Sequence, residues 1–333
     1  MRALFAVLSP AGARARLPIL IFHRVHAEPD PLFPDDPCVA RFDQICRWVA
    51  RWHQVLPLAQ GLRQLADGSL PARALAITFD DGYADNHDLA APILRRHGLT
   101  ATFFIATGFL DGGIMWNDIV VETLRGARGE RLDAGACGIP GLQHLPLGDM
   151  AERRQSMHAV LNAVKYLPLA QRLDCVQQLA RQAAVSLPAD LMMASHRVPA
   201  MRQLGMDIGG HTVSHPILAR LAAHEARDEI VRGKQRLEEL LQQRVALFAY
   251  PNGRPGQDYD ARTVSLVREA GFDAAVTTSP GAAGQGADPF QIPRFTPWDH
   301  SAWRFALRQA HNLLQEVETA AARNSQTASG LAA

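Results

Sequence analysis

The stretch that most constrains this chain covers residues 74–86 and reads A-L-A-I-T-F-D-D-G-Y-A-D-N. It begins as a short apolar run, typical of a buried parallel strand, and the run ends in Asp80, Asp81 and Gly82. Two like charges at the edge of an apolar core each need a cation, a hydrogen-bond donor or a proton. A bound metal ion would satisfy the pair. The alternative is an Asp-Asp turn whose side chains cap a helix that starts near Ala84.

Strand-like and helix-like segments alternate on both sides of this stretch. Apolar runs at residues 17–22 and 100–107 are expected to be strands, and a helix is expected over residues 84–97, with Gly98 as its stop. Further strands are expected at residues 206–210, 245–250, 272–278 and 292–297. This alternation predicts an α/β fold with parallel strands.

Residues 112–200 interrupt the alternation. They are rich in helical patterns and turn residues and contain no clear strand, so we expect a helical insertion beside the core. The expected organisation is a single catalytic domain over residues 1–320. The small and polar residues 321–333 are expected to form a disordered tail.

Composition excludes several classes of protein. The formal net charge of the 333 residues is +1, and no cluster of Lys and Arg indicates nucleic-acid binding. The four cysteines are widely spaced, which is typical of reduced thiols. The apolar part of the start, residues 3–8, is shorter than the core of a signal peptide, and no run approaches the ~18 apolar residues of a membrane span. We therefore expect no cleaved signal, no transmembrane segment and a cytoplasmic location.

A second polar motif, G-G-H-T-V-S-H-P, occupies residues 209–216. Its histidines, His211 and His215, can face one point if the turn between them is helical. Neutral imidazoles suit zinc and similar metals, although an isolated pair with this spacing is more often incidental. Here the pair follows an expected strand, as the two aspartates do, and ligands in parallel α/β folds gather at the carboxyl ends of strands.

Taken together, T-F-D-D-G at residues 78–82 and G-H-T-V-S-H-P at residues 210–216 resemble the first two motifs of the polysaccharide deacetylase family, which carries the NodB homology domain (carbohydrate esterase family 4). The resemblance covers residues 17–313, and residues 112–200 are the least similar part. It implies a distorted (β/α) barrel with about seven strands. It also implies hydrolysis of N-acetyl groups on the amino sugars of a glycan.

The resemblance also assigns roles at the site. It implies that Asp81, His211 and His215 hold a divalent metal and that Asp80 is the general base. Three protein ligands leave a position open for water and the acetyl carbonyl, and Asp80 would remove the water proton. The donor set favours zinc, while cobalt, nickel, manganese or iron would also fit.

The third family motif, normally Arg-Pro-Pro-Tyr-Gly, is altered in this chain. The matching residues 249–253 read A-Y-P-N-G, so Ala249 replaces the arginine and Asn252 replaces the tyrosine. The backbone N–H of Asn252 could still stabilise an oxyanion, because that role needs no particular side chain. The arginine of the relatives holds the catalytic aspartate ionised. Arg294, at the end of a late expected strand, is the candidate replacement, and the alternative for Arg294 is a structural ion pair.

The Leu-x-His motif that supplies the general acid in relatives is also missing near the C-terminus. His23 ends the first expected strand, so it belongs to the same rim as Asp80 and His211. This arrangement resembles a branch of the family whose first strand ends in a Tyr-His pair. We predict that His23 protonates the departing nitrogen. The alternative is a histidine hydrogen-bonded to loop backbone.

Three functions remain open from the sequence. The first is a metal-dependent deacetylase of an N-acetylated oligo- or polysaccharide, with a role in exopolysaccharide metabolism. The second is a deacylase of a small N-acylated sugar or another amide. The third is a glycan-binding relative without activity, which the missing arginine favours and the intact Asp80, Asp81, His211 and His215 disfavour.

Overall fold

The computed structural model describes residues 1–297 and 299–320, so the tail expected at residues 321–333 lies outside the described residues. The chain divides into two compact units. One, the barrel unit, comprises Met1–Glu28, Asp35–Leu110 and the chain from Met193 onward; the other comprises Pro29–Pro34 and Asp111–Met192. The second unit falls close to the insertion expected at residues 112–200.

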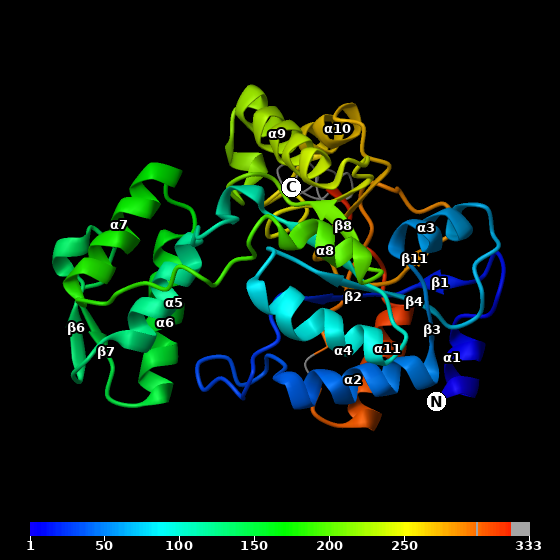
Figure 1. Ribbon diagram of the computed structural model, residues 1–333, viewed down its shortest axis with the longest axis horizontal. Helices are drawn as coiled ribbons and strands as arrows, with labels where there is room; N and C mark the ends of the chain where they lie inside the picture. Colours follow the sequence, from blue (N-terminus) through cyan, green and yellow to red (C-terminus); the bar gives the residue numbers. More distant parts are fainter. Residues whose placement is uncertain (298, 321–333) are drawn as a thin grey trace, which may run out of the picture. The chain divides into compact units, whose positions relative to one another are not determined.

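A parallel sheet forms the centre of the barrel unit (Figure 1). Its strands are β2 (Ile19–Phe22), β3 (Gln54–Val55), β4 (Ala74–Phe79), β5 (Thr102–Ile105), β8 (Asp207–Gly210), β9 (Leu247–Ala249) and β10 (Ala274–Val276). The order across the described sheet is β10-β9-β8-β5-β4-β2, and β3 pairs with the start of β4. All six residues of β4 are buried, as the apolar run predicts.

The sheet curls until its two edges meet the same segment. Phe295 exchanges backbone hydrogen bonds with β2, through Ile21 N (3.0 Å) and Ile19 O (2.8 Å). Ile292 does the same with the other edge, through Thr277 N (2.8 Å) and Ala275 O (3.0 Å). The strand expected at residues 292–297 is thus an extended segment with isolated parallel bridges, and it closes the barrel.

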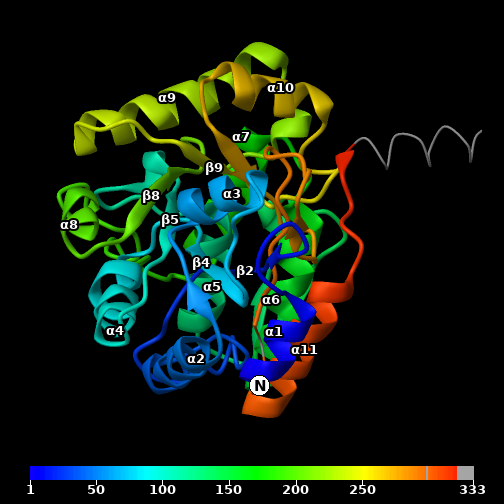
Figure 2. The same cartoon turned by 90° about the vertical axis from the view of Figure 1, so that its right-hand side faces the viewer.

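Helices surround the sheet in the barrel unit (Figure 2). They are α1 (Arg2–Leu8), α2 (Val39–Trp52), α3 (Leu58–Ala66), α4 (Ala91–Arg96), α8 (Arg197–Gln203), α9 (Ala223–Leu241), α10 (Ala261–Glu269) and α11 (Ala302–Leu314). A short antiparallel pair joins β1 (Arg16–Leu17) to β11 (Ala283–Gly284). The helix expected over residues 84–97 is interrupted: a π-helical turn, Asn86–Ala90, precedes the six-residue α4.

Alternate residues of β4 belong to two different cores. Leu75, Ile77 and Phe79 pack with residues of α2 and α4, whereas Ala74 and Ala76 pack with small residues of the other strands and with α3. This is the period of two expected of a strand buried on both faces. Continued beyond Ala76, the same alternation brings Thr78 and Asp80 to the barrel interior.

The second unit has its own apolar core, built by α5 (Trp116–Gly126), α6 (Met150–Val164) and α7 (Leu169–Gln182). It also contains an antiparallel pair, β6 (Arg131–Asp133) with β7 (His144–Pro146). The expectation of no strand over residues 112–200 was therefore wrong. These strands are three residues long and have one buried residue each, which is too short a pattern to be read from sequence.

Among the described residues, no helix combines the length and the apolar character that a membrane span requires.

Candidate metal centre and active site

Asp80 and Asp81 lie where β4 ends, and both side chains are buried. Asp81 (φ 78°) and Gly82 (φ 89°) are both left-handed, so the chain reverses direction directly after the strand. A side chain at Gly82 would also meet Ile105 at 2.9 Å. The reversal separates the two carboxylates, because Asp80 turns into the barrel while Asp81 faces the histidine loop.

The loop from β8 to α9 carries His211 and His215. The turn between them is not helical, contrary to the condition stated for the sequence, because Thr212 (φ 68°) and His215 (φ 52°) are both left-handed. Backbone bonds fix the loop against the next strand end: Thr107 N donates to Thr212 O (3.1 Å) and Gly108 N to Val213 O (2.8 Å). Two left-handed residues bring the rings together at a centroid distance of 4.8 Å.

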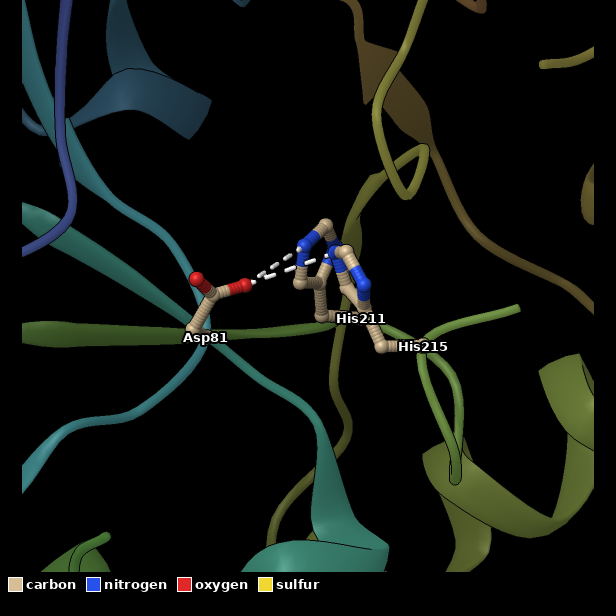
Figure 3. A group of neighbouring side chains, drawn as sticks. All are labelled: Asp81, His211 and His215. Atoms are coloured by element: carbon tan, nitrogen blue, oxygen red, sulfur yellow. Dashed lines mark ion pairs between the residues drawn. The ribbon is translucent and has the colours of Figure 1, made fainter. Parts of the chain in front are cut away.

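The two imidazoles and one carboxylate converge, as Figure 3 shows. Oδ1 of Asp81 lies 3.4 Å from Nε2 of His211 and 3.4 Å from Nε2 of His215. This oxygen is buried and has no hydrogen-bond partner. Two ligands that are each ~2.1 Å from a tetrahedral ion lie ~3.4 Å apart, so these separations fit a zinc-sized cation.

The tautomer of His211 suits a ligand. Its Nδ1 lies 2.7 Å from the carbonyl oxygen of Ala249 and donates a proton to it, which leaves Nε2 as the lone-pair nitrogen facing Asp81. Burial lowers the pKa of His215 to about 4, against the opposing charge of Asp81, so this ring is also neutral near pH 7. His215 therefore offers a free lone pair, and His211 offers one when its Nε2 carries no proton.

Arg294 approaches Asp80 from inside the barrel. Its guanidinium donates to both carboxylate oxygens, NH1 to Oδ1 (2.6 Å) and NH2 to Oδ2 (2.6 Å), and NH1 also lies 3.2 Å from Thr78 Oγ1. Nε donates to the carbonyl of Thr277 (2.9 Å). Burial raises the pKa of Asp80, but the charges of Arg294 and His211 outweigh it and leave that pKa below its usual value. Asp80 is therefore held ionised.

The charges of the site do not balance without a further cation. Asp80 and Asp81 supply two negative charges, and Arg294 supplies one positive charge. Burial lowers the pKa of His211, yet the two carboxylates together raise it above the ordinary value. Either a proton on His211 or a metal ion would neutralise the excess. The unpartnered Oδ1 of Asp81 and the two imidazole nitrogens fit the metal.

The remaining predicted residues lie at the same edge of the barrel. His23 follows β2 with its side chain exposed, and its charge contributes, after burial and the larger effects of Arg294 and His211, to the pKa of Asp80. Asn252 is half-buried and left-handed (φ 59°), and its carbonyl accepts a hydrogen bond from Thr278 Oγ1 (2.6 Å). The catalytic roles of His23 and Asn252 stay predictions.

Sequence reasoning missed Glu229, which lies on the long, charged helix α9. Its Oε2 accepts from the backbone N–H groups of Val213 (2.9 Å) and Ser214 (2.8 Å), and its Oε1 from the Ser214 hydroxyl (2.7 Å). One turn later, Gly233 allows α9 to lie close to the histidine loop, since a side chain there would meet the Thr212 backbone at 2.8 Å. The only sequence pattern that could have indicated this contact is an acid followed four residues later by a glycine. Many helices contain that pattern without contacting a loop.

Asn86 was also missed as part of this arrangement. Its Nδ2 donates to the carbonyl of His23 (2.8 Å), and the neighbouring Asp85 accepts from Val25 N (3.2 Å). The turn after β4 therefore fixes the loop that carries His23.

Comparisons with known proteins bear on the family and the fold of this chain. A sequence model described as polysaccharide deacetylase matches residues 67–127 and 174–275. The protein YxkH of Bacillus subtilis (strain 168), named for the same family, is 22% identical over 282 residues, which are 84% of this chain and 71% of that protein.

Solved structures share the fold. The Streptococcus pyogenes deacetylase PplD, in complex with acetate, matches with a TM-score of 0.58 at 19% identity, over 88% of this chain and 98% of its own. IcaB from Ammonifex degensii matches with a TM-score of 0.57 at 18% identity, over 91% of this chain and 98% of its own.

The contacts of Glu229 generate a prediction. Glu229→Ala should weaken zinc or cobalt binding by about 10- to 100-fold, because the loop that carries His215 loses three hydrogen bonds. Affinity is measured by competition with a chromophoric chelator. Glu229→Gln should restore part of it, since the amide oxygen still accepts. Glu239→Ala on the exposed side of α9 is the control and should bind metal normally. Equal affinities for Glu229→Ala and Glu239→Ala would contradict the assigned role.

Proposed function

This chain belongs to the polysaccharide deacetylase family, and from that membership we propose that it removes N-acetyl groups from the amino sugars of a glycan in a metal-dependent reaction. The observation that carries the proposal is the convergence of Asp81, His211 and His215 beside the ionised Asp80. The family supplies the reaction class, a deacetylase that is a hydrolase. The donor set of one carboxylate and two imidazoles favours zinc, with cobalt, nickel, manganese and iron as alternatives.

We assign the metal to Asp81, His211 and His215. When bound there, it would act as a Lewis acid toward the acetyl carbonyl and lower the pKa of a water molecule. Asp80 is held ionised and oriented by the two-pronged contact with Arg294, so its carboxylate accepts the proton of the attacking water. We assign to the backbone N–H of Asn252 the role of donor to the developing oxyanion.

The second half of the reaction needs an acid. The bond between the acetyl carbon and the nitrogen breaks, and the nitrogen takes up a proton as it leaves, so the products are acetate and a free amine. We assign that proton to His23, whose backbone is fixed by Asn86 while its ring stays exposed at the same edge. The exposed ring can meet a substrate that approaches from solvent.

Release of acetate is the direct test. The protein should release acetate from N-acetylglucosamine oligomers, lose the activity after chelation and regain it with zinc or cobalt. Asp80→Asn should lower kcat by about 100-fold or more and still bind metal, because the general base is lost while the ligands remain. Glycan binding without acetate release, with metal loaded, would identify an inactive binding relative instead.

The substrate class is decided by parallel assays. Polymer, oligomer and an N-acetylated sugar nucleotide are compared at equal acetyl concentration. A higher kcat/KM on the oligomer or polymer is expected of a glycan deacetylase. Preference for the sugar nucleotide would favour the small-molecule deacylase.

Arg294 gives a prediction with a pH signature. In Arg294→Met, Asp80 loses its cation and its pKa rises, so the acidic limb of the kcat/KM profile should move to higher pH. The limb moves to higher pH because a general base is active only above its own pKa. Arg294→Lys keeps the charge without the two-pronged contact and should shift the limb less. Arg294→Lys also allows the test to be made if Arg294→Met fails to fold, because it keeps a cation beside Asp80.

A matched control for Arg294 is available. Arg244 also contacts both oxygens of an aspartate, Asp273 (2.6 and 2.9 Å), but this pair is exposed. Arg244→Met should leave the profile unchanged. If the Arg294 variants keep the wild-type profile and turnover, Arg294 is a structural ion-pair residue.

The role of His23 predicts dependence on the leaving group. His23→Ala should slow the release of acetate from an N-acetyl sugar by about 100-fold, because an amine leaves poorly without a proton. It should have little effect on 4-nitrophenyl acetate, whose leaving group needs none. The alkaline limb of the amide profile should also disappear. His87→Ala is the control, since His87 pairs with Asp88 on the helical turn. Equal losses on both substrates would exclude the acid role.

A further inference from the structure

The exposed large apolar side chains of the barrel unit gather on two helices. Among its described residues, they are Met1, Leu4, Val7, Trp303, Leu307 and Leu314. Val7 is 78% exposed and Leu314 is 68% exposed. All six belong to or flank α1 and α11, and we call them the α1/α11 surface. Side chains of this size on a folded protein usually scatter singly, so this concentration needs an explanation.

The α1/α11 surface is continuous. Helices α1 and α11 contact each other, and they lie side by side in Figure 2. On α11 the residues Trp303, Leu307 and Leu314 are spaced by four and seven, so they form one stripe along the helix. The opposite sides of the two helices are anchored, because Phe5 and Phe305 both pack against Trp52 (ring centroids 6.4 and 6.1 Å). The stripe therefore points outward from a firmly packed base.

The charged side chains within α1 and α11 have one sign, and the exposed Glu316 and Glu318 follow α11. Neither α1 nor α11 contains Asp or Glu, while Arg2, Arg304 and Arg308 lie along them. The guanidinium of Arg304 stands 5.9 Å from the ring centre of Trp303. Arg308 is paired with Asp299 (2.7 Å), whereas Arg304 and Arg2 are exposed. An apolar stripe with arginines beside it complements a surface that is apolar below and anionic above.

The α1 side of the surface lies toward the amino ends of the strands, away from the metal centre. The carbonyl of Ser9, directly after α1, accepts from Arg73 N (3.0 Å), and β4 begins at the next residue. Gln309 of α11 contacts His53 (2.7 Å), which precedes the strand paired with the start of β4. The six residues of β4 then span ~20 Å to the aspartates. The α1 side of the surface is therefore remote from the aspartates, whereas α11 begins beside His300, whose carbonyl accepts from Arg41 at the start of α2.

We infer that the α1/α11 surface adsorbs the protein to the anionic phospholipid face of a membrane, with the catalytic edge turned away from the lipid. A second copy of the chain fits less well. In a two-fold dimer the same patch meets itself, so the arginines of one copy would face those of the other, and neither helix holds an acid to pair with them. Lipid phosphates supply the missing negative charge. The inference does not depend on the proposed reaction.

Flotation with vesicles tests the inference on the full chain. The protein should float with vesicles that contain phosphatidylglycerol, and less with pure phosphatidylcholine. Trp303→Ala combined with Leu307→Ala should reduce the partition coefficient by about tenfold or more, because two exposed apolar anchors are removed. Arg304→Glu should reduce it too, and added salt should weaken the wild type.

The control removes exposed apolar side chains elsewhere. Leu169→Ala with Leu173→Ala, on α7 of the second unit, changes residues that are 43% and 39% exposed. This pair should leave flotation unchanged, and all variants should keep wild-type unfolding temperatures. Flotation that is absent, or equally reduced by the control, would overturn the inference. So would a concentration-dependent dimer, abolished by Trp303→Ala with Leu307→Ala, in a protein that does not bind vesicles.

Discussion

The structure depends on how two adjacent buried carboxylates are neutralised. A strand that ends in Asp80 and Asp81 brings two negative charges to the edge of an apolar core, where unpaired charge is costly. The left-handed Asp81 and Gly82 separate the two side chains so that each has its own positive counterpart. Arg294 pairs with Asp80, while Asp81 faces the Nε2 atoms of two imidazoles, where a proton on His211 or a metal ion would balance its charge. Neighbouring residues of one type thereby acquire different surroundings, which support the base proposed at Asp80 and the metal ligand proposed at Asp81.

Arg294 reaches this position through the way the barrel closes. The segment that carries it bonds to β2 on one side and β10 on the other, so its side chain enters the interior at the level of Thr78 and Asp80. The family motif has its arginine at the position of Ala249, which ends β9. A guanidinium from either strand end can hold the aspartate, because the role requires only its two-pronged contact with the carboxylate. A closed barrel offers several strand ends at equal distance from its axis.

Much of this site was accessible from the sequence, for a physical reason. Polar residues directly after buried strands must meet at one edge of a parallel sheet, which brought the two aspartates and the two histidines together. The family resemblance then singled out Asp81, His211 and His215 as ligands, and the missing motif arginine led to Arg294. Glu229 could not, because an acid on a long charged helix has the same pattern whether it faces water or a loop. The strands β6 and β7 escaped notice because three residues give no period to recognise.

The barrel also separates tasks along its axis. At the amino ends of the strands, α1 and α11 are held by aromatic packing on Trp52 and present apolar and cationic side chains outward. At the carboxyl ends, left-handed residues and charged pairs position Asp80, Asp81 and the histidines. The packed strands between them are short, buried and strongly bonded, so adsorption at one end need not distort the other. An enzyme that works on a glycan near a membrane would benefit from this separation, because the lipid-facing residues and the reacting residues can vary independently.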